Sequence, residues 1–406
     1  MNSEPTSTPT ERRKPQHWAA RWLGQDAFRR LQSNRWAWNS GRFLLLLFAV
    51  AILTPLFPLQ SPIHGDLQKR RFERPNLHFQ RLVQTSDLGF PDDSVRTAWQ
   101  QYSEQLSELD RRIDQAASGP ARQNLILERD RVKETLNPLN KLWYHPTLTT
   151  QWLIRARLLV FGDWCVPSIF GCDDQGRDVL SRVFWGSRVS LTVGLVAALV
   201  SLLIGVTFGA IAGYAGGWVD SLMMRFVDTL YSIPFIFVVI FLITLLDAEA
   251  WKNALAEWNI DRIAIFYVMI GAIYWLTMAR VVRGQILSLK TEPFVEAATV
   301  LGYPRRRILF RHLLPNTLGV VLVYLTLTIP SVILFEAFLS FLGMGVSPPD
   351  VSWGLLVNEG LQVITPIETK WWIAAFPSLV MSLTLLALNF LGDGLRDALD
   401  PKLKGR

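Results

Sequence analysis

The sequence predicts an all-α polytopic membrane protein with six transmembrane helices, a five-helix core preceded by an extra N-terminal span. Half of the 406 residues are hydrophobic, 18% are charged and 12% are aromatic. This composition is more apolar than that of an average soluble domain. The basic residues concentrate in segments that adjoin long apolar stretches. The net charge of +7 therefore reports on membrane orientation and gives no argument for nucleic acid binding.

Six apolar stretches approach or exceed the length of about 20 residues that a helix needs to cross a bilayer core. They comprise residues 43–59, 189–214, 226–246, 263–282, 318–342 and 371–391. No short apolar segment with a small-residue cleavage site precedes the first stretch. We therefore expect that stretch to remain in the protein as a membrane anchor.

The distribution of Lys and Arg predicts the orientation in the membrane. Residues 1–42 contain eight basic residues against three acids, and residues 283–316 contain six basic residues. Residues 247–261 contain one Lys and four acids. Because cytoplasmic loops are rich in Lys and Arg, we expect both termini, residues 283–316 and the tail at 392–406 to be cytoplasmic.

Two interpretations remain open for the N-terminal tail. Apolar and aromatic residues recur there at roughly helical spacing, with Arg21, Arg29 and Arg30 on the other faces; they are Trp18, Trp22, Ala27, Leu31 and Trp36. This pattern predicts an amphipathic helix on the inner leaflet. The alternative is a disordered basic tail, which we expect for residues 1–10.

The long segment at residues 60–188 is expected outside the membrane, since long loops translocate regardless of charge. Within residues 94–137 two apolar stripes repeat in steps of three and four, separated by Ser118-Gly119-Pro120. They predict an antiparallel helical hairpin, with Tyr102, Leu109, Val132 and Leu136 between its helices. A binding role and a purely structural insertion are both consistent with it.

The cytoplasmic segment at residues 283–316 combines helix-forming and helix-ending signals. Residues 296–301 favour a helix, Gly302 can end it with a positive φ, and Pro304 can begin another. The expected structure is a helix–turn–helix that projects from the membrane face.

Glu296-Ala-Ala-Thr-Val-Leu-Gly302, with Leu314-Pro315 downstream, resembles the coupling loop of bacterial ABC importer permeases. In that family the loop docks into a groove on the ATPase subunit. The resemblance implies this role for the following residues: Glu296, Ala297, Ala298, Gly302, Arg305, Arg306, Arg311, His312, Leu314 and Pro315. For the three arginines at 305–307, anchoring by the positive-inside rule is an equal alternative.

Further motifs between Gly171 and Pro401 resemble those of the oligopeptide/dipeptide branch of that family. They occur along the chain in the same order as in that family. They include Gly171-Cys-Asp-Asp-Gln-Gly-Arg177, Gly213-Tyr-Ala-Gly-Gly-Trp-Val-Asp220, Glu336-Ala-Phe-Leu-Ser-Phe-Leu-Gly343 and the ending from Leu391 to Pro401. His312 is typical of this branch. Two features depart from it: Ser168-Ile-Phe-Gly-Cys-Asp173 replaces the usual His-Pro-Leu-Gly-Thr-Asp, and the outer insertion is unusually long.

Glycines and acids inside the apolar stretches need separate explanations. Gly205, Gly209 and Gly213 recur every four residues, the spacing that lets helices approach closely in lipid. We prefer helix packing over a hinge as the role of these glycines.

Asp228 and Glu336 are intramembrane acids, which should face the bundle interior or an interface. A structural pair and a role in translocation are both open for them.

The two cysteines, Cys165 and Cys172, both fall in the expected outer segment. In an oxidising compartment they predict a disulfide that closes a small loop. The sequence has no zinc-binding spacing of Cys and His, no Gly-x-x-x-x-Gly-Lys-Ser/Thr motif and no Ser/His/Asp arrangement. We therefore expect no metal, no cofactor and no enzymatic activity in this chain.

The resemblance implies a permease subunit of an ATP-driven importer for oligopeptides or dipeptides in the bacterial inner membrane. Its implied partners are a second homologous permease, two ATPase subunits that bind ATP and Mg²⁺, an outer solute-binding protein, the peptide substrate and membrane lipid. A nickel-chelate or microcin importer of the same architecture is the nearest alternative. A membrane-anchored sensor or assembly protein is the alternative from another class. A secondary transporter is disfavoured because the spans show no inverted repeat.

Overall fold

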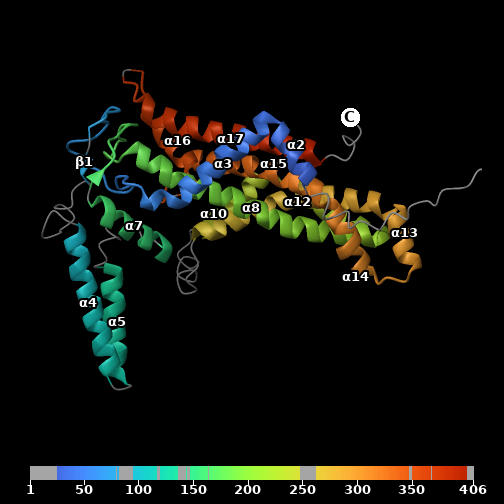
Figure 1. Cartoon of the computed structure of the whole chain (residues 1–406), viewed down its shortest axis with the longest axis horizontal. Coiled ribbons are helices and arrows are strands. Elements are labelled where there is room, and N and C mark those ends of the chain that lie inside the picture. Colours follow the sequence, from blue (N-terminus) through green and yellow to red (C-terminus); the bar gives the residue numbers. More distant parts are fainter. Residues whose placement is uncertain are drawn as a thin grey trace, which may run out of the picture.

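The computed structural model describes residues 25–78, 80–81, 95–116, 119–135, 143, 147–162, 164–246, 262–346, 350–366 and 368–399. Five long helices run side by side along one axis (Figure 1): α3 (Arg35–Leu53), α8 (Val179–Ala215), α12 (Arg262–Lys290), α15 (Leu314–Phe341) and α17 (Trp371–Leu399). Each is long and apolar enough to cross a membrane. α9 (Gly217–Ser232) and α10 (Phe235–Leu246) supply a sixth span if this bent pair is counted as one.

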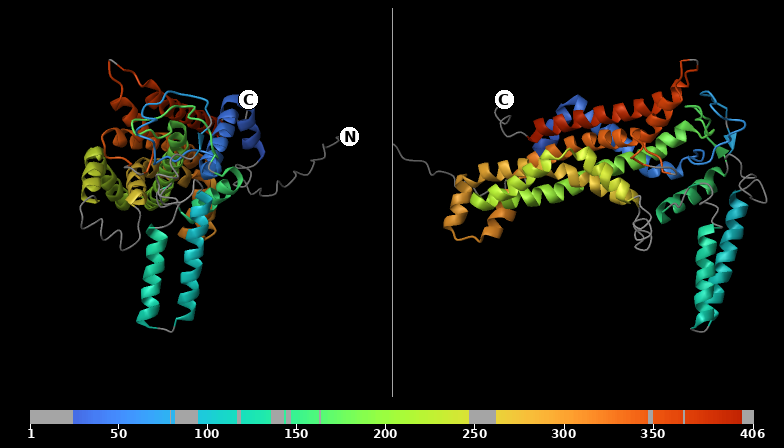
Figure 2. Two further views of the ribbon diagram at one scale, coloured as in Figure 1. Left: turned by 90° about the vertical axis from the view of Figure 1, so that its left-hand side faces the viewer. Right: turned by 180° about the vertical axis from the view of Figure 1, so that it is seen from behind.

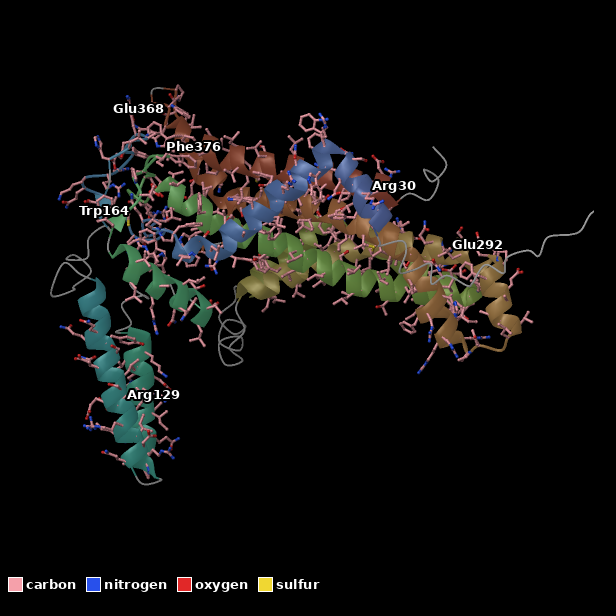
Figure 3. All side chains as sticks on the ribbon, in the orientation of Figure 1. Arg30, Arg129, Trp164, Glu292, Glu368 and Phe376 are labelled. Carbon is pink, nitrogen blue, oxygen red and sulfur yellow. The ribbon has the colours of Figure 1, made fainter. Side chains whose placement is uncertain are left out.

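The two ends of the bundle carry different elements. One end, called the loop end here, carries α13 (Pro293–Val300) and α14 (Arg305–Ile308). The opposite end, called the hairpin end, carries α7 (Leu148–Phe161), α16 (Trp353–Gln362) and a small sheet in which β1 (Gln80–Arg81) pairs antiparallel with β2 (Trp164–Cys165). Figure 3 shows Glu292 at the loop end and Trp164 and Glu368 at the hairpin end.

The third predicted span is broken, contrary to the single helix expected at residues 226–246. α9 and α10 meet at an angle of 78° around Ile233 and Pro234. Proline has no N–H to donate and disfavours the helical conformation in the residue before it. Ile233 accordingly has extended dihedrals, φ −86° and ψ 124°. The chain therefore changes direction in the middle of an apolar stretch.

Several helices are longer than their apolar stretches. α8 begins at Val179, ten residues before the predicted span, because Asp178 caps it by accepting a hydrogen bond from the backbone N–H of Ser181 at 2.7 Å. Its 37 residues correspond to about 55 Å of helix. α3 begins at Arg35 instead of residue 43 and passes at Thr54 into a short 3₁₀ turn, η1 (Thr54–Leu56).

The predicted hairpin consists of α4 (Val95–Gln115) and α5 (Pro120–Thr135), which pack against each other and stand away from the bundle (Figure 2). Tyr102 and Leu109 are buried and Val132 is half-buried. Arg129 of α5 approaches Asp110 of α4 at 3.6 Å. Leu136 and Ser118, also part of the prediction, lie outside the described residues. The position of the hairpin outside the membrane remains a prediction.

Helix α7 was not predicted. Its Arg157 is fully buried and donates hydrogen bonds to the carbonyl oxygens of Leu59 and Trp164, at 3.3 and 3.1 Å. These bonds hold α7 against η1 at the end of α3. Leu148, Trp152 and Leu159 remain exposed on it. The hairpin is thus joined to the bundle through a helix that is fixed at the C-terminal end of the first span.

Of the predicted N-terminal amphipathic helix, Trp18 and Trp22 lie outside the described residues. The described part is α2 (Gln25–Ser33) together with the start of α3. Leu31 and Ala37 lie against Gly394 of α17, whereas Trp36 is 71% exposed. α2 and the start of α3 therefore pack on α17, and contact of Trp36 with lipid remains a prediction.

Candidate functional site

The loop between α12 and α15 forms the expected helix–turn–helix. α13 begins after Glu292 with Pro293 in its first turn. Gly302 ends it in the left-handed region, with φ +75°. The N–H groups of Gly302 and Tyr303 then donate to the carbonyl oxygens of Thr299 and Ala298, at 3.0 and 3.1 Å, which satisfies the end of the helix.

The second half of the loop is continuous with the next span. α14 begins after Pro304 and passes into a π-helical turn, η2 (Leu309–Leu313), before α15 starts at Leu314. Pro315 lacks the N–H that a regular helix would bond to Arg311. Rare single π turns of this kind occur inside α-helices. Because no break separates α14 from α15, a displacement of α14 would act directly on a membrane span.

α13 has two distinct faces. Val295 and Ala298 are each 4% exposed and pack in one cluster with Ile308, Leu313 and Ile286 of α12. On the other side Glu296 and Ala297 are exposed. The tip of the loop presents Val300, 87% exposed, and Leu301, 71% exposed. One face therefore fixes the loop to the bundle, and the other leaves an apolar tip without cover.

The predicted coupling residues divide accordingly. Six of them are exposed: Glu296, Ala297, Gly302, Arg305, Arg306 and Arg311. Three are half-buried, Leu314, Pro315 and His312, and one, Ala298, is buried. Contact of Ala298 with a partner is therefore the part of the expectation that the geometry disfavours. The His312 ring stacks on Tyr303 with centroids 5.9 Å apart, and the Arg307 guanidinium lies 4.3 Å from the Tyr303 centroid. These contacts hold Arg307 beside Tyr303, close to the apolar tip.

Gly205, Gly209 and Gly213 form the contact between α8 and α12, as their spacing predicts. A Cβ placed on Gly209 would lie 2.3 Å from the carbonyl oxygen of Ala279, and one on Gly205 would lie 2.6 Å from Cβ of Met278. A Cβ on Gly213 would lie 2.9 Å from the carbonyl oxygen of Arg283. The two helices are therefore in backbone contact along α8.

The two acids that were predicted to lie within the membrane, Glu336 and Asp228, occupy opposite environments. Glu336 of α15 is fully buried and accepts a hydrogen bond from Ser340 Oγ at 2.8 Å. Asp228 of α9 is 63% exposed and forms an ion pair with Arg280 of α12 at 2.7 Å. Glu336 thus lies in the bundle interior, whereas Asp228 lies on the surface of this chain and has a partner.

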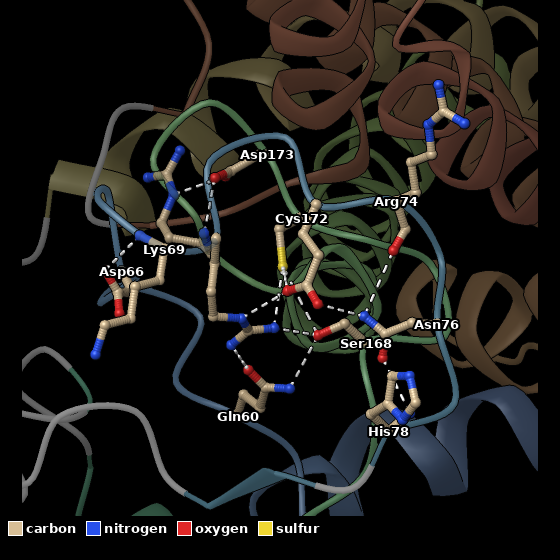
Figure 4. Close-up of polar contacts among 12 residues, drawn as sticks. Gln60, Asp66, Lys69, Arg74, Asn76, His78, Ser168, Cys172 and Asp173 are labelled. Carbon is tan, nitrogen blue, oxygen red and sulfur yellow. Dashed lines mark hydrogen bonds and ion pairs between the residues drawn. The ribbon is translucent and has the colours of Figure 1, made fainter.

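The predicted disulfide is not formed, because both cysteines are free and buried. Cys165 Sγ lies 3.1 Å from the Arg157 guanidinium. Cys172 Sγ lies 3.0 Å from the Arg70 guanidinium, in a cluster that also includes Gln60 and Ser168 (Figure 4). Each thiol is held by a different arginine, so the two side chains are directed into separate sites.

We expect Cys172 to be unreactive in the folded protein. Burial raises the pKa of its thiol from 9.0 to about 12, although the nearby Arg70 guanidinium opposes the shift. A pKa of about 12 in place of 9.0 lowers the thiolate fraction at neutral pH about a thousandfold. The thiolate is the form of cysteine that reacts. In a Cys165→Ala variant, maleimide labelling should be absent below pH 9 and complete after denaturation. Rapid labelling of the folded protein at pH 7 would contradict this environment.

A buried polar network at the hairpin end was missed from the sequence. Arg182 of α8 is 1% exposed and pairs with Asp173 at 2.7 Å and with Glu359 of α16 at 2.5 Å. Arg177 also pairs with Asp173 at 2.7 Å. Asp178 lies beside this network, and burial raises its pKa to about 7. The signal in the sequence was the concentration of Asp and Arg between Gly171 and Arg182. The ion pairs join the segment before α8 to α8 and α16.

Comparison with known proteins agrees with this architecture. Residues 205–405 match the family described as binding-protein-dependent transport system inner membrane component. Residues 22–75 match the N-terminal TM domain of oligopeptide transport permease C. Over 233 residues the chain is 50% identical to the oligopeptide transport system permease protein OppC of Haemophilus influenzae, covering 57% of this chain and 70% of that protein. The chain belongs to this permease family.

The other relatives identify the branch of the permease family. The dipeptide transport system permease protein DppC of Bacillus subtilis is 45% identical over 235 residues, covering 58% of this chain and 69% of that protein. OppC of Escherichia coli K12 is 50% identical over 233 residues, covering 57% of this chain and 72% of that protein. This permease therefore belongs to the oligopeptide/dipeptide branch of the ABC importers. The hairpin α4–α5 lies between the two family matches.

Proposed function

We propose that this permease is one of two membrane-spanning subunits of an ATP-driven importer for oligopeptides or dipeptides, and that its α13–α14 loop docks on an ATPase subunit. The observation that carries the proposal is the two-faced loop. Its inner face is packed on α12 and α15, while Val300 and Leu301 stand exposed beside the Arg305–Arg307 cluster. An apolar tip with a charged rim suits a partner surface that covers it.

The loop is mechanically connected to the spans. Two residues, Thr291 and Glu292, separate α12 from α13, and α14 continues into α15. Lys290 at the end of α12 donates to the Tyr214 carbonyl oxygen at the end of α8 at 2.9 Å. A displacement of a docked ATPase would therefore reach three spans through few flexible bonds. In the proposed alternating-access cycle, this displacement opens the pathway to one side of the membrane at a time.

The remaining components follow from the same proposal. The sequence has no Gly-x-x-x-x-Gly-Lys-Ser/Thr motif, so two ATPase subunits would bind ATP and Mg²⁺ and perform the hydrolysis. A second homologous permease would complete the pathway, and a solute-binding protein would deliver peptide at the hairpin end. Both termini would then lie in the cytoplasm with the loop end, in the inner membrane. The relatives named for oligopeptide and dipeptide transport support peptide as the substrate.

The docking proposal predicts a selective defect for Val300→Asp. Covering one Val side chain contributes about 1.5–3 kcal/mol, and a carboxylate in the covered position adds a desolvation cost. We expect at least a tenfold loss of co-purified ATPase and of ATP-dependent peptide uptake by the reconstituted importer. Leu127→Asp, at a 57% exposed site on α5, is the matched control and should behave as wild type. If the Val300→Asp variant co-purified the ATPase at the wild-type level, the proposed docking site would be refuted.

A further inference from the structure

Helix α9 has a polar face and an apolar face within the membrane-spanning part of the chain. Exposed polar residues recur on it in steps of three and four: Ser221, Arg225, Asp228 and Ser232. Exposed large apolar residues occupy another side, and they are Trp218, Leu222 and Phe226. The apolar side suits lipid, whereas the polar side requires water or a polar partner.

Helix α12 has a corresponding stripe of small and polar residues. It consists of Thr277, Arg280, Gly284 and Ser288, all exposed. Another side of α12 is packed, with Leu276, Ala279, Val282 and Ile286 each at most 1% exposed. The exposed stripe therefore has none of the Leu, Ile and Phe side chains that a lipid-facing helix surface usually presents.

Direct contacts join the two stripes. Arg280 donates to Asp228 at 2.7 Å, and its guanidinium lies 4.0 Å from the ring centroid of Tyr231. The Tyr231 hydroxyl forms a hydrogen bond with the Thr277 hydroxyl at 2.5 Å. The Asp228 and Arg280 side chains are nevertheless 63% and 44% exposed. The two helices thus present one continuous polar surface with an exposed ion pair on it.

This surface lies at the level of an exposed apolar surface on α8. Gly209 of α8 touches the backbone of Ala279, the neighbour of Arg280. On the α8 turns next to Gly209, Leu203 is 68% and Ile211 is 47% exposed. Arg280 also precedes the end of α12 by ten residues, about 15 Å along the helix. Exposed charges are costly at such a depth unless they face water or a polar partner.

We propose that this surface of α9 and α12 lines a water-filled part of the transport pathway, where Asp228 and Arg280 contact the charged ends of a passing peptide. The inference rests on the proposed importer function. A peptide with free termini carries an ammonium and a carboxylate, and the exposed pair offers one charge to each. Because each side chain already has a partner, the contact would be weak and exchangeable, which suits passage better than retention.

Cysteine accessibility tests whether the surface is aqueous. Thr277→Cys and its matched control Leu203→Cys are compared in the assembled importer in proteoliposomes. The unsubstituted protein, whose two cysteines are buried, serves as background. A charged, membrane-impermeant methanethiosulfonate should modify Cys at 277 at least ten times faster than Cys at 203, while an apolar maleimide modifies both. Equal, slow reaction of both sites with the charged reagent would overturn the proposal, since the surface would then be covered by the second permease or by lipid.

Substrate chemistry tests the role of the ion pair. Maximum uptake rates at saturating solute-binding protein are compared for a peptide with free termini and for its acetylated, amidated form. We expect Arg280→Gln to reduce the rate for the free peptide at least tenfold and to change the rate for the blocked peptide little. An equal reduction for both peptides would assign the pair a structural role only. If the wild-type importer transports neither peptide, the proposed function fails, whereas the accessibility ratio still decides whether the surface is aqueous.

Discussion

Gly302→Asp should abolish ATP-dependent uptake and co-purification of the ATPase, while the permease still inserts at normal levels. Gly302 has φ +75° and ends α13. A side chain in this region costs about 1–2 kcal/mol, which the chain can relieve by moving Leu301 and Tyr303. Such a movement displaces the apolar tip and the Tyr303–His312 stack together. Uptake, ATPase co-purification and membrane insertion are the three measurements.

The control for this variant is Gly343→Asp at the opposite end of α15. Gly343 has φ +76°, and a Cβ there would meet no atom within 4 Å, as at Gly302. The two substitutions therefore introduce similar strain and the same charge. Co-purification of the ATPase should be lost for Gly302→Asp and kept for Gly343→Asp. If Gly302→Asp keeps both co-purification and uptake, the loop is a simple connector and the importer proposal loses its main support.

Gly209→Leu should prevent the bundle from folding. A Cβ at this position would lie 2.3 Å from the carbonyl oxygen of Ala279, and backbone atoms cannot move aside as a flexible side chain can. Overpacking a core typically costs about 1–3 kcal/mol, and we expect at least about 3 kcal/mol here because α8 and α12 must separate. Thermal denaturation of the detergent-solubilised protein should show no cooperative transition, or one at a much lower temperature.

Gly284→Leu is the matched control for stability, because it adds the same side chain to the other helix of the pair. A Cβ on Gly284 meets no atom within 4 Å. The denaturation midpoint of Gly284→Leu should stay within a few degrees of that of the wild type, whatever the effect of the substitution on uptake. Equal stability of Gly209→Leu and wild type would show that α8 and α12 do not meet in the observed register.

Several expectations from the sequence depended only on local chemistry, and these agree with the structure. The helix–turn–helix in the α13–α14 loop follows from Gly302, which tolerates a positive φ, and from Pro304, which suits the start of a helix. Gly205, Gly209 and Gly213 predicted a close helix contact because their spacing places them on one side of α8. Long apolar stretches predicted the spans because a bilayer requires satisfied backbone groups.

Other features were decided by tertiary contacts. Pro330 and Pro377 lie inside continuous helices, whereas the chain breaks before Pro234, so proline alone does not locate the bend. Pro330 is buried among packed helices, while Pro234 is exposed; neighbouring helices stabilise an interrupted backbone in the first case and not in the second.

The sequence by itself determined the class, five of the six predicted spans and the family, because apolar length, charge bias and motif order are local properties. Only the tertiary structure decided that Cys165 and Cys172 have separate arginine partners: Arg157 lies eight residues before Cys165, whereas Arg70 comes from 102 residues before Cys172. It likewise placed Asp228 beside Arg280, 52 residues away in the chain. Such pairings depend on how helices cross, and the crossing is set by the sum of many packing contacts that no single segment encodes.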